Sequence, residues 1–353
     1  MVGKIRWGVI GSGGIALRRT IPEGIVPAAN AELVAVYDIH AAVNQEVGRK
    51  FGAAAVASVA ELLATDVEAV YVATPAHLHY QQVLGCAQAG KHVLCEKPLG
   101  MSVAEAEGML GASKEAGVQL GAAFMMRFHC QHQAALKIVQ EGKLGKPVYG
   151  RAQLSCWYPP IQGAWRQDPA LGGGGSLIDM GGHSIDLLEM FFGPVVKVSC
   201  FINNTVQPYQ PEDSAVAMLW FANGALATVD TFFCIPDEAS RNVLELYGSL
   251  GSILAEGTIG QGSQGRMTAQ LKREITGYDA QQAREAEGGF AITPEPVNTY
   301  RAEIEEFSQA LLERRPSLLT GEPGLRSQQV LAACYESARS GRAVTLPPSA
   351  AGI

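Results

Sequence analysis

Two hydrophobic patterns divide the chain, and the first alternates short apolar runs with longer amphipathic segments. Short runs rich in valine, isoleucine and alanine are typical of buried strands, whereas a period of about 3.6 residues is typical of helices. The predicted strands are residues 5–10, 31–38, near 54, 69–73, 92–95 and 118–123. The predicted helices are residues 42–51, 59–64, 79–89 and 102–116. Because strands that alternate with helices form parallel sheets, residues 1–123 are predicted to be a doubly wound α/β domain.

The second pattern, over residues 124–353, alternates apolar and polar positions, as is typical of strands with one buried face. The predicted strands are one that begins at 148 and those at 195–203, 214–221, 224–234, 241–247 and 252–255. The predicted helices are residues 132–141, 299–313 and 324–340. Residues 260–289 are polar, rich in glycine and without a period, so we expect a loop or insertion there. Residues 124–353 are therefore predicted to be a second domain, with helix 324–340 packing back on the first.

The composition narrows the class of protein. A chain of 353 residues with 47% hydrophobic residues suits two domains with cores of their own. Its net charge of −7, without a basic run, argues against a nucleic-acid surface. Its seven cysteines form no CxxC pair, which indicates reduced thiols rather than a disulfide framework or a zinc ribbon. We find no signal-peptide pattern and no apolar segment of the roughly 20 residues that span a bilayer, so we expect a soluble, cytoplasmic protein.

A glycine-rich turn, GSGGIA, follows the first predicted strand directly. Such a turn brings backbone amides close to a pyrophosphate at the N-terminus of the next helix. The residues predicted to bind a dinucleotide in this way are Gly11, Ser12, Gly13, Gly14 and Ile15.

An acidic residue, Asp38, ends the second predicted strand about 20 positions after the glycine turn, as dinucleotide sites require. Its carboxylate could accept hydrogen bonds from both ribose hydroxyls of NAD and would repel the 2′-phosphate of NADP. NAD is therefore the predicted cofactor. The alternative is a carboxylate that only caps the following helix.

Two further motifs, TPAHLH and CEKP, follow the third and fourth long strands, at the sheet edge where doubly wound proteins bind ligands. Thr74, Pro75, Glu96 and Lys97 are therefore predicted to face the cofactor. A lysine beside the nicotinamide could hydrogen-bond a substrate oxygen, and the positive charge of the oxidised ring would favour its neutral form. The alternative is an ordinary surface lysine in a loop.

The stretch GGGGSLIDMGGHSIDLLEMF places Asp179, His183 and Asp186 at spacings of four and three residues. At about 100° per residue these side chains would share one stripe of a helix. A metal site, a phosphate loop and a catalytic helix are all compatible with that spacing. The imidazole of His183 has an ordinary pKa near neutrality and can both give and take a proton.

The motifs VIGSGGIA, ATPAHLH, GKHVLCEKPLG and GGGGSLIDMGGHSIDLL, in this order, resemble the glucose–fructose oxidoreductase/inositol dehydrogenase family over nearly the whole chain. The resemblance implies an N-terminal Rossmann domain and a C-terminal α+β domain whose open, mainly antiparallel sheet often serves as an oligomer interface. It implies hydride transfer between NAD(P) and a sugar, polyol or related carbonyl compound, without a catalytic metal. Lys97, Asp179 and His183 then become the catalytic residues, with Lys97 or His183 as the proton-transfer group.

The resemblance also suggests roles for residues outside these motifs. His79 matches a position near the cofactor, and Arg127 matches one that lines the active-site cleft, with an interdomain salt bridge as the alternative. Tyr300 matches a position that sometimes reaches the substrate, with core packing as the alternative.

An aromatic loop, CWYPPIQGAWRQDPALGGGG, precedes the predicted catalytic helix. Flat rings with polar neighbours suit a sugar, so Tyr158 and Trp165 are predicted to contact the substrate. The loop resembles the 1,5-anhydro-D-fructose reductase branch of the family, in which a Trp-Arg pair lies beside cofactor and substrate. Trp165 and Arg166 would take that place, with a packed loop as the alternative.

Three functions remain open at this point. The leading interpretation is an NAD-dependent dehydrogenase of sugars or cyclic polyols, assembled as a homodimer or homotetramer through its second sheet. The second is an NADPH-dependent ketosugar reductase, which the aromatic loop favours. The third is a non-catalytic regulator that binds NAD and a sugar, which the presence of Lys97, Asp179 and His183 disfavours.

Overall fold

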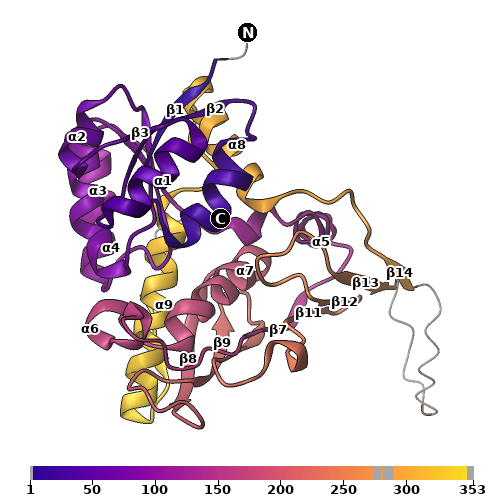
Figure 1. The fold of residues 1–353 in the computed structure, drawn as a ribbon. Coiled ribbons are helices and arrows are strands. Elements are labelled where there is room, and N and C mark those ends of the chain that lie inside the picture. Colours follow the sequence, from indigo (N-terminus) through magenta and orange to yellow (C-terminus); the bar gives the residue numbers. More distant parts are fainter. Residues whose placement is uncertain (1–2, 273–279, 281–288, 348–353) are drawn as a thin grey trace. The chain divides into compact units, whose positions relative to one another are not determined.

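The computed structural model describes residues 3–272, 280 and 289–347 of the chain (Figure 1). The chain divides into two compact units. Unit 1 comprises Met1–Met125, Gly163–Gly174 and Asn298–Gln329. Unit 2 comprises Met126–Gln162, Gly175–Val297 and Val330–Ile353. Among the helices of the described residues, none combines the length and the apolar character that a membrane span requires.

A six-stranded parallel sheet forms the centre of unit 1, in the order β3-β2-β1-β4-β5-β6. Its strands are β1 (Ile5–Ile10), β2 (Ala31–Tyr37), β3 (Ala54–Ala55), β4 (Ala69–Val72), β5 (His92–Cys95) and β6 (Leu120–Ala122). The sheet confirms the predicted doubly wound fold. The strand order reverses between β1 and β4, and ligands of such sheets bind where the carboxyl ends diverge at this point.

Helices follow the strands of unit 1 in alternation. They are η1 (Ala16–Ile25), α1 (Ala41–Phe51), α2 (Val59–Ala64), η2 (Ala76–Leu78), α3 (His79–Gln88) and α4 (Val103–Glu115). The start of α4 shows why the sequence begins a helix here: Ser102 accepts a hydrogen bond from the Glu105 amide, and Glu105 accepts one from the Met101 amide. This reciprocal cap satisfies amides that lack a partner inside the helix.

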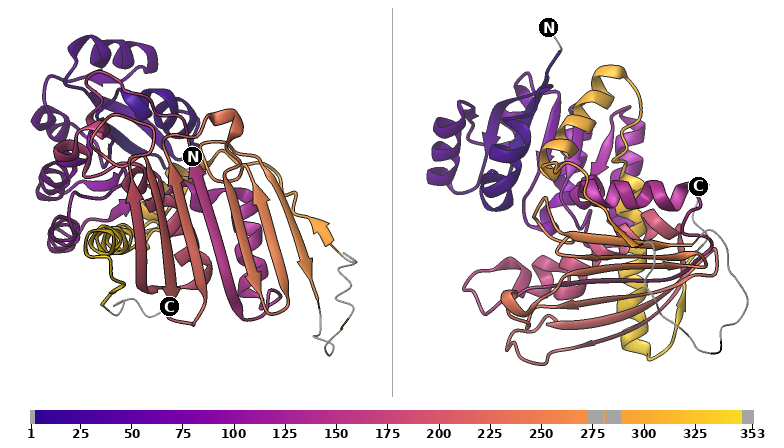
Figure 2. Two further views of the ribbon diagram at one scale, coloured as in Figure 1. Left: turned by 90° about the horizontal axis from the view of Figure 1, so that it is seen from below. Right: turned by 90° about the vertical axis from the view of Figure 1, so that its right-hand side faces the viewer.

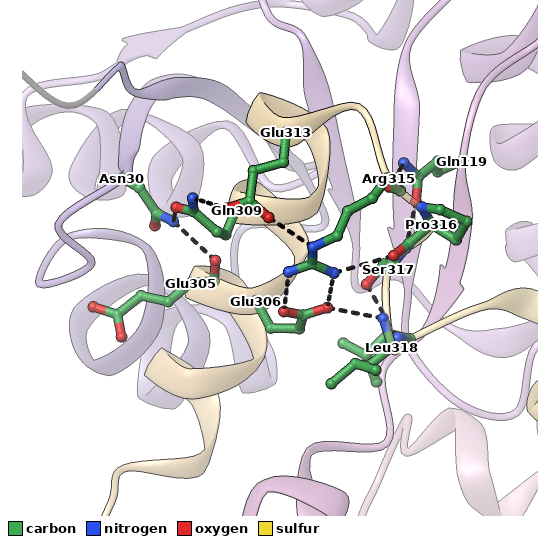
Figure 3. Close-up of polar contacts among 11 residues, drawn as sticks. Asn30, Gln119, Glu305, Glu306, Gln309, Glu313, Arg315, Pro316, Ser317 and Leu318 are labelled. Carbon is green, nitrogen blue, oxygen red and sulfur yellow. Dashed lines mark hydrogen bonds and ion pairs between the residues drawn. The ribbon is translucent and has the colours of Figure 1, made fainter.

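Helix α8 (Thr299–Glu313) belongs to unit 1 although it lies far away in the sequence, and it packs on η1, β1 and β2 (Figure 1). Figure 3 shows the polar contacts at its C-terminal end. The Arg315 guanidinium pairs with Glu306 at 2.7 Å, and the Gln119 side chain, just before β6, donates to the Arg315 carbonyl at 2.8 Å. Asn30, just before β2, donates to the Glu305 carbonyl. These contacts fasten α8 to the ends of two sheet strands.

A nine-stranded sheet forms the centre of unit 2, in the order β14-β13-β12-β11-β7-β10-β9-β8-β15 (Figure 2). Its strands are β7 (Pro147–Ser155), β8 (Val195–Asn203), β9 (Ser214–Phe221), β10 (Leu226–Phe232), β11 (Val243–Gly248), β12 (Gly251–Glu256), β13 (Arg266–Leu271), β14 (Gly289–Ala291) and β15 (Val344–Thr345). The pair β7 and β10 is parallel, and the other pairs that the described residues form are antiparallel. The predicted α+β character of this part is confirmed.

Helices pack on one face of this second sheet. The remaining helices of the described residues are η3 (Met125–Phe128), α5 (Cys130–Gln140), η4 (Trp165–Gln167), α6 (Pro169–Gly172), η5 (Leu177–Gly181), α7 (Gly182–Phe192), η6 (Asp237–Ala239) and α9 (Gly321–Ser340). Of these, η4 and α6 belong to unit 1. Helix α7 lies so close to β7 that a Cβ on Gly150 would be 2.8 Å from the Phe192 ring. Glycine at this position therefore permits the close packing of helix on strand.

One expectation for unit 2 is wrong. Residues 266–271, placed in a predicted loop at 260–289, form strand β13 and pair with β12. Met267 and Ala269 face the core while Arg266, Thr268 and Gln270 alternate with them, a strand pattern too short to stand out among glycines. Residues 273–279 and 281–288 of that expected loop lie outside the described residues.

Candidate active site

The glycine turn after β1 has the shape of a dinucleotide cradle. Gly11 has a φ of +83°, and a Cβ there would lie 2.8 Å from the backbone of Ala73, so a side chain would close the cradle. The amides of Gly11 and Ser12 both donate to the Tyr37 carbonyl, which ties the turn to the end of β2. The Ser12 hydroxyl is fully buried and has no hydrogen-bond partner among the described residues. Backbone curvature and a spare hydroxyl both fit a bound pyrophosphate.

Asp38 lies directly against this turn. Its Oδ2 accepts a hydrogen bond from the Gly13 amide at 2.9 Å, and its Oδ1 accepts one from the His40 amide at 2.9 Å. The second contact closes a local turn before α1, whose N-cap residue is His40, and no side-chain cap hydrogen bond forms at that helix start. Each carboxylate oxygen keeps a further lone pair, so both contacts leave room for ribose hydroxyls. The contacts fix the carboxylate beside the cradle.

His79 connects the loops that follow β4 and β5. Its Nε2 lies 2.9 Å from the Thr74 carbonyl and its Nδ1 lies 2.9 Å from the Pro98 carbonyl. Burial lowers the pKa of His79, and the positive charges of His77 and Lys97 lower it further. A neutral ring donates one hydrogen bond, so it can satisfy one carbonyl at a time. The ring therefore holds the Thr74–Pro75 turn next to the EKP turn, and a direct cofactor contact stays a prediction.

The EKP turn collects charge at the carboxyl end of β5. The Tyr71 hydroxyl, from β4, donates to Glu96 at 2.6 Å. Burial raises the pKa of Glu96, while the Tyr71 hydrogen bond and the charges of Lys97 and Arg166 oppose that rise. Lys97 is partly buried and precedes Pro98 through a cis peptide bond. Glu96, Lys97 and Arg166 thus lie within electrostatic reach of one another in unit 1.

The Trp-Arg pair of the aromatic loop also belongs to unit 1. The Arg166 guanidinium lies 4.2 Å from the Trp165 ring centre, a cation–π contact within η4. The imidazole of His77 lies 3.3 Å from the Leu171 carbonyl, which links this loop to the turn after β4. The His77 contact places this loop beside the carboxyl end of β4.

The predicted catalytic helix of unit 2 begins with a π-helical turn. Residues Leu177–Gly181 form η5, which carries Asp179, and α7 starts at Gly182 and carries His183. A π turn has a wider period than an α turn, so the predicted single stripe does not apply across this junction. Asp179 is partly buried, and His183 is 9% exposed.

Asp186 has a different role from its two neighbours. It is buried and accepts three hydrogen bonds from the Arg127 guanidinium, at 2.7, 2.8 and 3.0 Å. Both residues belong to unit 2, so the expected alternative of an interdomain salt bridge is wrong. The predicted substrate contact of Arg127 stays a prediction. The pair fastens η3 (Met125–Phe128) to the helix that carries His183.

Two predicted substrate contacts lie in packed surroundings. Tyr158 is partly buried in unit 2, with its carbonyl accepting from the Tyr209 hydroxyl and its ring 4.9 Å from that of Phe233. Tyr300 is 3% exposed in unit 1, and the Arg19 guanidinium lies 5.7 Å from its ring centre. Their contacts with a substrate remain predictions.

Three polar residues near these sites were missed in the sequence. Tyr71 lies in an apolar run and looks like a core residue until Glu96 is brought to it from the next strand. Glu303, on α8, is fully buried with no hydrogen-bond partner for either carboxylate oxygen among the described residues. Glu212 precedes a strand in the segment EDSA and reaches the start of the helix with Asp179 and His183. Glu303 and Glu212 share one signal in the sequence: each is a carboxylate next to an apolar run.

No cluster of three or more histidine, cysteine or acidic side chains in the described ranges is arranged to hold a metal ion. All seven cysteines lie in the described residues, none of them forms a disulfide, and four of them are buried.

Comparisons with known proteins agree with this geometry. Residues 5–124 match the oxidoreductase family with an NAD-binding Rossmann fold, and residues 132–254 match the GFO/IDH/MocA C-terminal domain. A 1,5-anhydro-D-fructose reductase of Ensifer adhaerens is 30% identical, over 97% of this chain and 98% of its own. A D-xylose 1-dehydrogenase (NADP(+)) of Haloferax volcanii is 29% identical, over 96% of this chain and 99% of its own.

A solved structure shares the fold over nearly the full length. The WlbA dehydrogenase of Bordetella pertussis, in complex with NADH and UDP-GlcNAcA, has a TM-score of 0.83 and 25% identity. The alignment covers 98% of this chain and 99% of that one. With both of its domains matched and a relative similar from end to end, the chain belongs to the Gfo/Idh/MocA family of oxidoreductases, enzymes with an NAD-binding Rossmann domain.

Proposed function

We propose that the protein transfers a hydride between NAD and a secondary alcohol or ketone of a sugar, a cyclic polyol or a sugar derivative. The observation that carries the proposal is Lys97 at the carboxyl end of β5, with Glu96 and Arg166, in a unit whose glycine turn fits a dinucleotide. The reductase and the dehydrogenase described above are named for sugar substrates, which supports this substrate class.

The residues of unit 1 would hold the coenzyme. The cradle of Gly11, Ser12, Gly13, Gly14 and Ile15 would receive the pyrophosphate, and Asp38 would receive the ribose next to the adenine. The second group, nearer the nicotinamide, comprises Thr74, Pro75, His79, Glu96, Lys97, Trp165 and Arg166. When bound, the coenzyme accepts or supplies the hydride.

The protein residues would manage the proton and the orientation of the substrate. In the oxidation, the C–H bond is broken with its electron pair leaving as hydride, while His183 or Lys97 takes the hydroxyl proton as the C=O bond forms. The other of the two hydrogen-bonds the reacting oxygen. Asp179 would accept a hydrogen bond from a neighbouring hydroxyl or orient the imidazole. In the reduction the same groups run in reverse, with the proton returned to the oxygen.

A second candidate function is an NADPH-dependent ketosugar reductase. The stacked Trp165–Arg166 pair supports it, together with the similarity to a 1,5-anhydro-D-fructose reductase. The carboxylate of Asp38 beside the cradle supports NAD instead, because a 2′-phosphate at that place would be repelled. The regulatory alternative has no such support, since each proposed catalytic group is present.

We also propose that the protein is a homodimer or homotetramer of the cytoplasm. Alternate residues of β9 leave the sheet on its outer face, where Val216, Met218 and Trp220 are 40%, 57% and 50% exposed. Phe201, on β8, is 76% exposed. An apolar sheet face of this kind is a typical surface for association with a second copy. Seven cysteines without a disulfide support a reducing compartment.

A substrate screen tests the function. Cyclic polyols and sugars are offered with NAD and with NADP, and ketosugars with the two reduced coenzymes, while the absorbance of the reduced nicotinamide is followed. We expect turnover of at least one polyol or sugar with NAD. If the coenzyme binds but no member of the panel is turned over in either direction, the substrate class proposed here is wrong.

A further inference from the structure

A buried carboxylate, Glu212, lies at the start of the helix that carries Asp179 and His183. It is 5% exposed and comes from the connection between β8 and β9. Its Oε2 accepts a hydrogen bond from the Gly175 amide at 2.9 Å, and its Oε1 accepts one from the Leu177 amide at 3.0 Å. All of these residues belong to unit 2.

The backbone of Glu212 completes the contact. Its carbonyl accepts from the Ser176 amide at 2.9 Å, so three consecutive amides, 175 to 177, donate to this one residue. A Cβ on Gly175 would lie 1.9 Å from that carbonyl, so only glycine allows the two segments to touch. The first amides of a helix have no partner inside it, and burial keeps water away from them. Glu212 thus satisfies the group of donors from which η5 begins.

A third donor to the carboxylate comes from α9. The Tyr335 hydroxyl lies 2.8 Å from Oε1. Burial raises the pKa of Glu212, and the hydrogen bonds from Leu177, Tyr335 and Gly175 oppose that rise by stabilising the ionised form. Negative charge is also favourable at the N-terminus of a helix. Three of the roughly four lone-pair positions of the carboxylate thus have a donor.

The anchor lies one hydrogen bond away from the first proposed catalytic residue. The Asp179 amide donates to the Gly175 carbonyl at 3.2 Å, and Gly175 is the residue that Glu212 holds. Ser176 adds a side-chain bond to the Thr231 carbonyl on β10. A shift of residues 175–177 would therefore be passed to Asp179 and, through α7, to His183.

We propose that Glu212 is a positioning residue of the enzyme, which fixes Asp179 and His183 through the first turn of their helix. The inference rests on the proposed function, since it assumes that these two side chains act on the substrate. Glu212 itself takes no part in proton transfer.

The test compares two neighbouring carboxylates. In Glu212→Gln the amide oxygen can still accept from Leu177 and Tyr335, but the amide NH₂ faces the Gly175 amide, donor against donor. Asp213→Asn is the matched control: Asp213 is fully buried and accepts from the amides of residues 205, 206 and 207, away from the helix. Tyr335→Phe removes one donor to the Glu212 carboxylate and leaves the hydrogen bonds from the Gly175 and Leu177 amides in place.

We expect Glu212→Gln to lower kcat by roughly 10- to 100-fold, because misplacement of catalytic groups by about 1 Å has an effect of that size. The Kd of NAD, which binds to unit 1, stays near the parent value. Asp213→Asn lowers Tm with kcat of the folded protein preserved, and Tyr335→Phe gives a smaller loss than Glu212→Gln. Hydrogen exchange of the amides at 179–185 should be faster in Glu212→Gln than in Asp213→Asn.

The outcomes separate the two proposals. If exchange at 179–185 and kcat of folded Glu212→Gln equal those of Asp213→Asn, Glu212 is an ordinary packing residue and the inference is overturned. If instead His183→Ala keeps the parent kcat while exchange in Glu212→Gln is still faster, the helix is anchored as described but is not catalytic. The catalytic role proposed for this helix then fails, and the inference fails with it, whereas hydride transfer itself is tested separately by the substrate screen.

Discussion

At the scale of single residues, the two proposed proton-transfer groups, Lys97 and His183, each lie next to residues that are held by other helices and strands. Lys97 follows a carboxylate that is held by Tyr71, and His183 follows a π turn that Glu212 anchors. A lysine and a histidine with defined neighbours are the two groups on which the proposed proton transfer depends.

Removal of either group should be costly for turnover. We expect Lys97→Ala and His183→Ala each to lower kcat by about 10²–10⁴-fold, the usual contribution of one acid–base group. The Kd of NAD, from fluorescence titration, should change little. The double variant should lose less than the product of both effects, since groups that act on one oxygen work as a unit. Full activity in folded His183→Ala would contradict the proposed role of the helix.

Coenzyme choice should depend on Asp38. Its carboxylate is fixed by the Gly13 and His40 amides, beside the cradle where the adenine ribose would bind. We expect kcat/KM to be higher with NAD than with NADP, and Asp38→Ser to narrow the ratio because the repulsion of the 2′-phosphate is removed. Equal or better kcat/KM with NADP in the parent enzyme would favour the ketosugar reductase instead.

The buried acid Glu303 should make the stability of the protein depend on pH. Burial and the charge of Glu96 raise its pKa well above the ordinary value. Because the pKa is raised in the folded state, the contribution of Glu303 to the free energy of unfolding is fully present below about pH 4.5. This contribution is lost as the pH rises towards the folded pKa. Glu303→Gln cannot ionise, so its Tm relative to the parent should increase from pH 5 to pH 8. A difference in Tm between Glu303→Gln and the parent that stays constant from pH 5 to pH 8 would contradict the expectation.

At the scale of elements, two histidines lie at the start of helix α5 (Cys130–Gln140): His129 is its N-cap residue and His132 lies in its first turn. His129 and His132 are buried with ring centres 4.7 Å apart, and His132 bridges the Met126 carbonyl and the Thr258 hydroxyl. Burial lowers the pKa of His129 to about 4 and that of His132 to about 3.

These depressed pKa values predict a loss of stability in mild acid. Above about pH 6.5 both histidines are neutral in the folded and unfolded chain, and no stability depends on them. As the pH falls towards 4, both histidines become protonated in the unfolded chain but stay neutral in the folded one. Each histidine therefore lowers the free energy of unfolding by about 1.4 kcal/mol per pH unit. In urea unfolding, His132→Asn should show a smaller decrease from pH 7 to pH 5 than the parent. A decrease in His132→Asn as large as that of the parent would contradict the expectation.

The elements could largely be predicted from the sequence because their signals are local. Predicted strands at 195–203 and 214–221 match β8 and β9, since alternation over eight or nine residues is hard to produce otherwise. The π turn at 177–181 was not predicted, because a one-residue widening of a helical turn leaves no distinct hydrophobic period in so short a segment. Contacts such as Arg127 with Asp186 join residues 59 positions apart, and nothing in either segment identifies its partner.

At the scale of the whole molecule, association is the main expectation. We expect light scattering at micromolar concentration to give the mass of a dimer or tetramer. Trp220→Glu, on the outer face of β9, should shift the measured mass towards that of the monomer, because it places a charge in an apolar interface. Leu318→Glu, at a position that is 69% exposed in unit 1, should leave the assembly unchanged. A parent protein that is only monomeric would refute the proposed interface.

Unit 1 is built from chain segments that are far apart in the sequence, and this affects how the protein folds during synthesis on the ribosome. The Trp7 indole donates to Ser308, 301 residues later, and Asn30 donates to Glu305, 275 residues later. At a synthesis rate of roughly 5–20 residues per second, the nascent β1 waits about 15–60 s for α8 to emerge. During that time the surface of η1, β1 and β2 on which α8 packs stays exposed. A chaperone that shields the surface on which α8 packs would therefore be expected to raise the yield of folded protein.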